Sequence, residues 1–282
     1  MANQRIIEFG FLQRMLTQAE SRKALFEDKT FIDNLKGEID EQIQVSEILS
    51  LDVFDTFLLR DNTSELFRFW EVAKNVSKII DREPIECLMA RYLATKASYR
   101  LGERVSGCRE GSLTEIHSSV SNLLTGDIRY TEEFVQVELE CEAKRLTPNT
   151  ALIEVIEQSP VPVILLSDMY AHAEQIKDIL ILIGIDTEIF NDVISSADTQ
   201  VSKNSGKIFR SVEKRLNKKP SNFLHIGDAF RGDYSQAKLN GWNAIHLPIP
   251  MSEINKRKKD HYETIEFLRN QHNFEIEINA PN

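Results

Sequence analysis

The stretch "ILSLDVFDTFLLR", residues 48–60, places two carboxylates inside an apolar run. Residues 48–54 have the composition of a short buried strand, and Asp52 and Asp55 lie near its end. A buried carboxylate is costly unless it is paired, bound to a metal or used in chemistry. The stretch therefore predicts a strand whose carboxyl end holds a cation or a reactive group.

The composition narrows the class of protein around this strand. The chain has 282 residues, of which 41% are hydrophobic and 28% are charged, so it can bury a large core. A net charge of −10 argues against binding to nucleic acid or to anionic lipid. The three cysteines form no C-x-x-C pair, and no secretory or transmembrane segment is evident. We expect a soluble, cytoplasmic protein with reduced thiols and no membrane role.

Strand and helix patterns alternate along the second half of the chain. Apolar runs predict strands at 48–54, 160–167, 192–196, 222–227 and 243–248. Helical patterns lie between them, near 171–183, 205–216 and 232–240. Such alternation predicts parallel strands joined by right-handed crossovers. The fold class is therefore α/β, with a doubly wound parallel sheet.

The remaining segments are helical and suggest four parts. Residues 63–147 contain four helical segments, at 64–80, 84–101, 112–125 and 131–146, which predicts a helical insert after the first strand. The predicted division is an N-terminal helical extension (1–45, with a helix pair between 5 and 44), a core (46–62 and 148–250), a helical cap (63–147), and a C-terminal helix and tail (251–282).

Polar residues follow three of the predicted strands. Asp52 to Thr56 leave the first strand, Ser167 and Asp168 leave the second, and Asp228 follows "FLHI", with Asp233 five residues later. In parallel sheets such side chains gather at the carboxyl ends of the strands. A lysine-bearing loop, "VSKNSGKIF", lies between two of these strands and supplies Lys203.

Taken in this order, the motifs resemble those of the haloacid dehalogenase superfamily. "LDVFDT", "VILLSDMY", "SKNSGKIF" and "HIGDAFRGD" are similar to its four motifs, and the insert lies where the family has its first kind of cap. The D-x-F-D-T and S-D-M-Y pair also resembles a bacterial subgroup sometimes fused to glycosyltransferases. The resemblance implies a Rossmann-like core and an aspartate nucleophile.

The resemblance also implies roles for individual residues. Asp52 would be the nucleophile, and Ser167 and Lys203 would hold the transferred group. Mg²⁺ would be the cofactor, because it prefers oxygen ligands, with Asp52, the Phe54 carbonyl and Asp228 as ligands and Asp233 behind them. Thr56 would be the hydroxyl residue of the first motif and a contact to substrate. Apart from the resemblance, Asp168 is a further candidate contact, and Arg60, just past the strand exit, could bind a second anionic group.

The sequence departs from the family pattern at Phe54. Phosphatases of this type carry an aspartate there as general acid and base, a role typically worth about 10²–10⁴ in rate. We hypothesise that Asp55 takes this role. The aromatic residue also allows a second function, because dehalogenases of the family carry one at this position. A third interpretation is a catalytically weak module that binds partners or regulates them.

The function favoured by the sequence is a Mg²⁺-dependent phosphatase that acts on a small phosphorylated metabolite, such as a sugar phosphate or nucleotide. It would work through an aspartyl-phosphate intermediate, and no nucleic-acid partner is expected. The extension at 1–45 could bind a protein partner or a second copy of the chain.

Overall fold

The computed structural model describes residues 10–276, beginning with three helices. These are α1 (Phe11–Gln18), α2 (Arg22–Leu25) and α3 (Lys29–Ile43). They replace the predicted helix pair, of which residues 5–9 lie outside the described part. Asp28 starts α3 by accepting a hydrogen bond from the amide of Phe31, which satisfies one of the free donors of a helix N-terminus.

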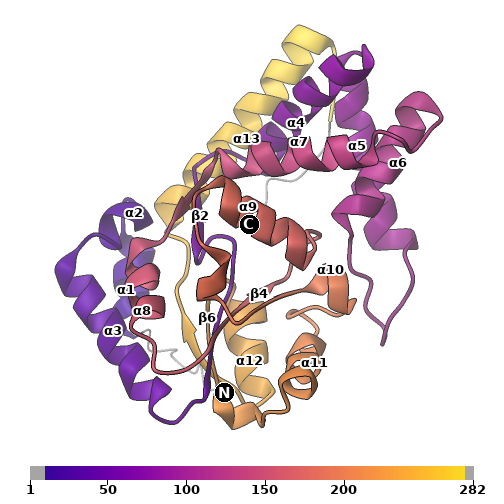
Figure 1. Cartoon of the computed structure of the whole chain (residues 1–282). Helices are drawn as coiled ribbons and strands as arrows, with labels where there is room; N and C mark the ends of the chain where they lie inside the picture. Colours follow the sequence, from indigo (N-terminus) through magenta and orange to yellow (C-terminus); the bar gives the residue numbers. More distant parts are fainter. Residues whose placement is uncertain (1–9, 277–282) are drawn as a thin grey trace, which may run out of the picture.

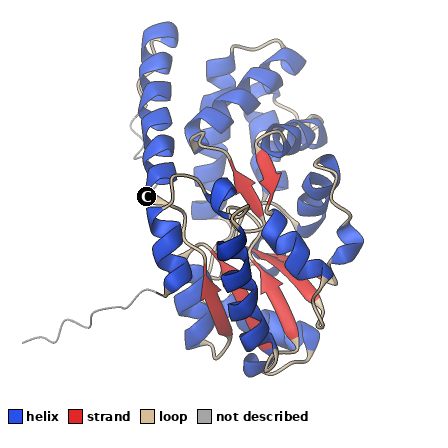
Figure 2. Cartoon of the chain, turned by 90° about the vertical axis from the view of Figure 1, so that its left-hand side faces the viewer, coloured by secondary structure: helices blue, strands red, loops and turns tan. Residues whose placement is uncertain are grey.

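A five-stranded parallel sheet forms the centre of the molecule (Figure 2). Its strands are β1 (Ile48–Leu51), β4 (Val163–Ser167), β5 (Asp192–Ser195), β6 (Phe223–Gly227) and β7 (Asn243–His246). The order is β5-β4-β1-β6-β7, so β1 is central and the chain winds outward on both sides of it. Ligands bind at such a reversal point, beyond the carboxyl ends of the strands. The predicted doubly wound sheet is confirmed.

Apolar side chains cover both faces of the sheet because alternate strand residues point to opposite sides. Leu49 and Leu51 belong to a buried cluster that includes Phe31 of the N-terminal helices. Ile48 belongs to a second cluster with Phe223. The helices beside the sheet are α8 (Thr150–Glu157), α9 (Ala173–Leu182), α10 (Ser196–Thr199), α11 (Lys207–Leu216) and α12 (Gln236–Leu239). Short turns of helix lie at η1 (Thr187–Ile189), η2 (Pro220–Asn222) and η3 (Phe230–Ser235).

Two short strands join the core to a helical insert. The strands β2 (Leu58–Arg60) and β3 (Leu146–Pro148) pair antiparallel as a ribbon. Between them lie four helices, α4 (Glu65–Ile80), α5 (Pro84–Leu101), α6 (Leu113–Thr125) and α7 (Thr131–Ala143), here called the cap. The cap has its own apolar cluster, which includes Trp70, Ile116 and Phe134.

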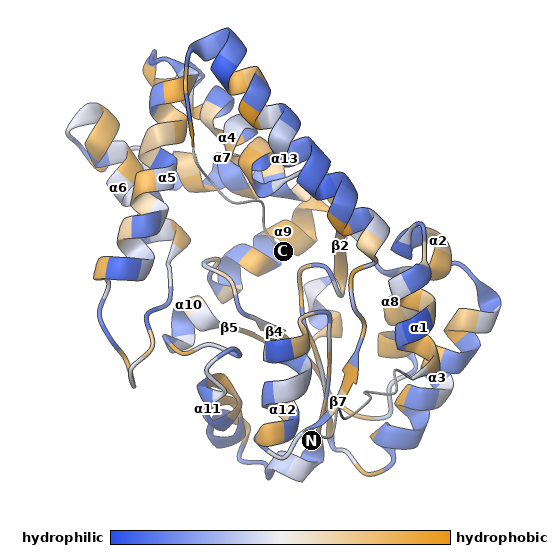
Figure 3. Cartoon of the chain, turned by 180° about the vertical axis from the view of Figure 1, so that it is seen from behind, coloured by the Kyte–Doolittle hydropathy of each residue, from blue (hydrophilic) through white to orange (hydrophobic). Residues whose placement is uncertain are grey.

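A long C-terminal helix, α13 (Met251–His272), runs from the core along the cap (Figure 1). It packs against α4, and Leu268 enters the apolar cluster of the cap. Figure 3 shows that most of α13 is coloured as hydrophilic. Among the described residues, no helix combines the length and the apolar character needed to cross a membrane.

The predicted strands and cap helices correspond to elements of the structure, but several short elements of the structure were not predicted. The predicted cap segments correspond to α4, α5, α6 and α7, and the five predicted strands correspond to β1, β4, β5, β6 and β7. The ribbon β2–β3 was missed because three residues are too few to show a two-residue alternation. Helix α8 was missed because its eight residues span barely two turns.

Candidate active site

Three of the predicted site residues lie just beyond neighbouring strands. Asp52 follows β1, Asp168 follows β4, and Asp228 follows β6. Leu51, the last residue of β1, is in register with Leu165 in the middle of β4 and with Ile226, the residue before the last of β6. The predicted gathering of these side chains at one edge of the sheet therefore occurs.

Three carboxylates share this edge. Asp52, Asp228 and Asp233 each offer an oxygen atom, and these atoms all lie within 4.8 Å of one another. Asp52 is 7% exposed and Asp233 is 1% exposed, so water screens their charges weakly. Asp228 is half-buried, so the described residues contain a group of like charges, two of them buried, that needs a counter-ion.

Lys203 provides part of the required positive charge. Its Nζ atom lies 2.5 Å from Oδ1 of Asp52 and 2.6 Å from Oδ1 of Asp233. It also donates a hydrogen bond to the carbonyl oxygen of Leu166, at 3.1 Å. Burial would lower the pKa of Lys203, but the charges of Asp233 and Asp52 raise it above its usual value. The ammonium group therefore stays charged between the two carboxylates.

Asp233 is held by partners on both of its oxygens. Oδ1 contacts Lys203 Nζ and Nε2 of His225, and Oδ2 accepts a hydrogen bond from the amide of Ala229 at 2.8 Å. A Cβ atom on Gly227 would lie 2.3 Å from Cγ of Asp233, so this approach requires a glycine. The arrangement fits a residue that fixes Lys203 better than one that gives its oxygens to a metal.

His225 supports Asp233 from beneath the sheet edge. Its ring lies between Ser50 Oγ, at 2.9 Å from Nδ1, and Asp233 Oδ1, at 3.1 Å from Nε2. Since a carboxylate only accepts, Nε2 carries the proton and Nδ1 accepts from the serine hydroxyl. Burial lowers the pKa of His225 and favours this neutral form.

Asp168 holds the lysine loop in place. Its Oδ1 accepts a hydrogen bond from the amide of Lys203 at 2.8 Å, and its Oδ2 accepts one from the amide of Asn204 at 3.3 Å. Both carboxylate oxygens of Asp168 therefore already accept hydrogen bonds within the chain. Its contact with substrate stays a prediction.

Two hydroxyl groups complete the edge. The Oγ atom of Ser167 is buried and has no hydrogen-bond partner. Buried polar groups are rarely left unpaired, so this hydroxyl is a natural contact for a bound ligand. Thr56 is also buried, and its Oγ1 lies 3.4 Å from Oδ1 of Asp228. This long hydrogen bond leaves most of the accepting capacity of Asp228 free.

Asp55 has surroundings of a different kind, with three guanidinium groups around its carboxylate. Arg22, Arg60 and Arg257 approach it to 2.8, 3.3 and 2.7 Å. Burial alone would raise the pKa of Asp55, but these charges outweigh burial and hold the pKa far below its usual range. A general acid needs a proton to give near neutral pH. The hypothesis that Asp55 is the acid and base therefore disagrees with its surroundings.

Arg60 is likewise committed to other residues. It contacts Glu142 at 2.6 Å and Asp55 at 3.3 Å, and its guanidinium carbon lies 4.4 Å from the centre of the Phe54 ring. The predicted contact of Arg60 with an anionic substrate would require it to leave two ion pairs. The structure assigns it to the join between core and cap, since Glu142 comes just before β3.

The charges at the edge of the sheet make a divalent cation a good fit. Burial raises the pKa of Asp52 to about 6, although Lys203 acts in the opposite direction. Burial and the charges of Asp52 and Asp233 raise the pKa of Asp228 well above its usual value. One lysine faces three carboxylates, so a hard cation would relieve the remaining repulsion. Asp52 and Asp228 are the better placed ligands, and the Phe54 carbonyl remains a predicted one.

Several important residues gave no signal in the sequence. Arg22 and Glu253 lie more than 200 positions apart, yet they bind each other, and Arg22 also binds Asp55. Only chain folding brings them together, and neither belongs to a motif. Glu142 and Arg257 were hidden for the same reason, because each reads as one charge among many on a helix surface.

Known proteins resemble the chain in sequence family and in fold. Residues 48–241 match the model of a haloacid dehalogenase-like hydrolase family. No curated protein matches the chain significantly. A solved 2-haloacid dehalogenase from Pseudomonas syringae pv. tomato has 12% identity and a TM-score of 0.50, covering 71% of this chain and 86% of its own.

Two further structures are similar at lower TM-scores. An L-2-haloacid dehalogenase from Xanthobacter autotrophicus has 16% identity and a TM-score of 0.46, over 71% of this chain and 77% of its own. A family enzyme from Bacteroides thetaiotaomicron, solved with magnesium and inorganic phosphate, has 14% identity and a TM-score of 0.48, over 71% of this chain and 93% of its own. Since the family model covers more than half of the sequence, the chain belongs to the haloacid dehalogenase-like hydrolases.

Proposed function

We propose that the chain is a Mg²⁺-dependent phosphatase of a small phosphorylated metabolite. The observation that carries this proposal is the excess of buried carboxylate over lysine at the sheet edge, where Asp52 and Asp228 lie close together. A phosphoester adds further negative charge, so a divalent cation would have to bind with it. The unpaired hydroxyl of Ser167 supports the same proposal, because it lies at the end of the neighbouring strand.

The chain's own residues can carry both halves of the reaction. A carboxylate oxygen of Asp52 would attack phosphorus, and the bond from phosphorus to the leaving oxygen would break. Water would then attack the phosphorus of the aspartyl phosphate, releasing inorganic phosphate and restoring the carboxylate. Lys203 and Ser167 would hold the equatorial oxygens. Bound Mg²⁺ would supply positive charge against the charge of the phosphoryl group.

The leaving oxygen also needs a proton, and Phe54 cannot supply one. Asp55 holds no proton near neutral pH because of its arginine partners. We therefore expect the rate to depend strongly on the leaving group, with good leaving groups favoured.

A second candidate is a dehalogenase, which Phe54 favours. In that reaction the Asp52 carboxylate would attack carbon, halide would leave, and water would cleave the resulting ester. This chemistry forms no new phosphoryl charge, so it does not explain why Asp228 joins Asp52 and Asp233 in one group. We therefore place it second.

A panel of phosphoesters and 2-haloacids would distinguish the two functions. We expect phosphate release with Mg²⁺, loss of release with chelator, and a fall on the order of 10³-fold or more in Asp52→Asn. Asp33→Asn, an exposed carboxylate on α3, is the matched control and should keep full activity. Halide release that persists with chelator would instead establish the dehalogenase.

A further inference from the structure

Arg22 joins the N-terminal helices to the loop that carries the nucleophile. It is 1% exposed, although it is an arginine in the first turn of a short helix. Its NH1 group donates to the backbone carbonyl of Asp55 at 2.5 Å, and NH2 contacts the Asp55 carboxylate at 2.8 Å. A planar guanidinium that binds two atoms of one residue fixes that residue's orientation.

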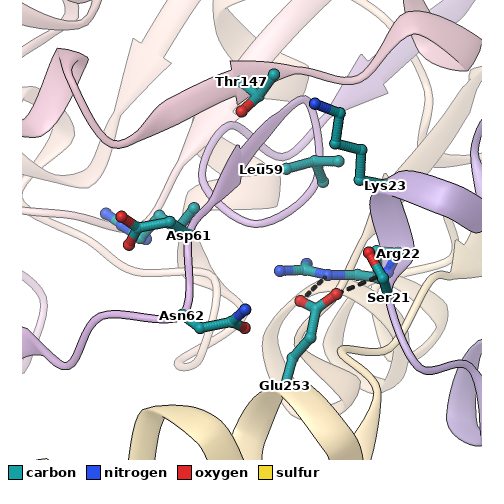
Figure 4. Close-up of a pocket in the computed structure, with 9 residues that line it drawn as sticks. Ser21, Arg22, Lys23, Leu59, Asp61, Asn62, Thr147 and Glu253 are labelled. Atoms are coloured by element: carbon teal, nitrogen blue, oxygen red, sulfur yellow. Dashed lines mark hydrogen bonds and ion pairs between the residues drawn. The ribbon is translucent and has the colours of Figure 1, made fainter. Parts of the chain in front are cut away.

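The other side of Arg22 is held by α13. Its Nε atom donates to Glu253 Oε2 at 2.9 Å, and its backbone amide donates to Oε1 at 2.6 Å. Figure 4 shows both contacts, with Lys23 extending away from Glu253. Glu253 binds both the backbone and the side chain of Arg22. It therefore fixes the orientation of the guanidinium group that contacts the loop.

The loop needs such support because of its backbone. Asp55 has φ of +66°, in the left-handed region that favours glycine. An aspartate there costs free energy unless its surroundings hold it. The amide of Asp55 donates to the carbonyl of Leu58 at 2.7 Å, and the amide of Leu58 donates to that of Val53 at 2.7 Å. The carbonyl oxygen of Asp55 accepts a hydrogen bond from Arg22.

We propose that Arg22 is a positioning residue of the active site, which sets the loop from Asp52 to Leu58 for binding of the divalent cation. The N-terminal helices would then be part of the catalytic machinery, since they carry the arginine that orients the loop. The inference rests on the proposed function for its cation, while its claim about loop order concerns the chain alone.

The test compares Arg22→Met with Lys23→Met, its exposed neighbour. Calorimetry with Mg²⁺ alone measures the affinity of the site. Hydrogen exchange at the amides of Asp55 and Leu58 measures the order of the loop without a ligand. Arg22→Lys tests whether charge without the planar fork is enough. The double variant Arg22→Met/Glu253→Gln removes the buried charge that the single variant leaves unpaired, so it keeps the test open if Arg22→Met fails to fold.

We expect Arg22→Met to weaken Mg²⁺ binding by about tenfold, as is typical of residues that orient metal ligands. Exchange at the two amides should rise by about tenfold, and kcat should fall with little change in KM. Arg22→Lys should be intermediate, and Lys23→Met should match the parent protein. If exchange and Mg²⁺ affinity are both unchanged in Arg22→Met, then Arg22 only stabilises the fold and the inference is wrong.

The same data separate this inference from the proposed function. If the parent protein binds no Mg²⁺ and cleaves no phosphoester, the proposed function fails, and unchanged exchange in Arg22→Met would then reject the inference on its own. If the parent protein binds Mg²⁺ and Arg22→Met binds it equally well, the inference fails and the function stands.

Discussion

Two buried charge clusters lie three residues apart in the sequence and have opposite electrostatic character. Around Asp52, three carboxylates face a single lysine. Around Asp55, three carboxylates (Asp55, Glu142 and Glu253) face three guanidinium groups (Arg22, Arg60 and Arg257). Arg68 adds a fourth at 3.5 Å from Glu142. The first cluster has fewer cations than carboxylates, and the second has more guanidinium groups than carboxylates.

This difference separates a site that reacts from one that supports it. A buried carboxylate with enough cationic partners is stable and chemically quiet, because its charges are already compensated. A buried carboxylate with too few partners has a raised pKa and attracts cations. Strongly shifted pKa values of this second kind are typical of functional sites. In our proposal the cluster around Asp52 performs the chemistry, and the cluster around Asp55 holds the loop.

Breaking the compensated cluster should have the largest effect on stability. Asp55→Asn keeps a residue that tolerates positive φ but leaves three buried guanidinium groups without their shared carboxylate. We expect the free energy of unfolding to fall by about 3 kcal/mol. Chemical denaturation measures this loss. Asp81→Asn is the matched control, because Asp81 also has positive φ, at +50°, and is exposed. Equal losses in the two variants would contradict the comparison.

The uncompensated cluster should respond to the same change in the opposite direction. Because the pKa of Asp228 is raised in the folded protein, its charge opposes folding increasingly as pH rises above its unfolded pKa. Without metal at pH 8, Asp228→Asn should therefore raise the free energy of unfolding by on the order of 1 kcal/mol. The stabilisation gained on adding Mg²⁺ should disappear in this variant. Thermal unfolding with and without Mg²⁺ would show both, and a destabilised metal-free variant would disprove the charge excess.

The pH dependence of Mg²⁺ affinity should show a smaller effect of the uncompensated cluster. The pKa of Asp52 is about 6, so its carboxylate takes up a proton as pH falls below 6. Protons and metal compete for the same oxygens, so Mg²⁺ affinity should fall about tenfold per pH unit below that point. Calorimetry between pH 5 and 8 would measure this change. An affinity that stays constant from pH 7 to 5 would rule out Asp52 as a ligand with this pKa.

Asp55 should show no change over the same pH range. Its folded pKa is depressed, so the stability that it contributes is present above its unfolded pKa of about 3.9 and is lost only as pH falls further. Denaturation of the parent protein and of Asp55→Asn should therefore differ by a constant amount between pH 5 and 8. A difference that shrinks near pH 6 would indicate that the arginine cluster does not hold the carboxylate.

The site residues that could be predicted from the sequence are those whose place follows from a nearby strand or loop pattern. Asp52, Ser167 and Asp228 each follow an apolar strand, and parallel strands bring their ends to one edge. Lys203 followed from its place in the loop after β5. The contact of His225 with Asp233 was not foreseen, because it depends on a histidine ring that Ser50 orients from the neighbouring strand.

The sequence by itself determined the alternation of strands and helices, the insert after the first strand, and the carboxylates at the strand ends. Local hydrophobic period and turn chemistry carry this information. Only the tertiary structure decided what Asp55 does. Its charge partners come from α2, β2 and α13, and whether a buried carboxylate is a reagent or a support depends on how many cations reach it in three dimensions.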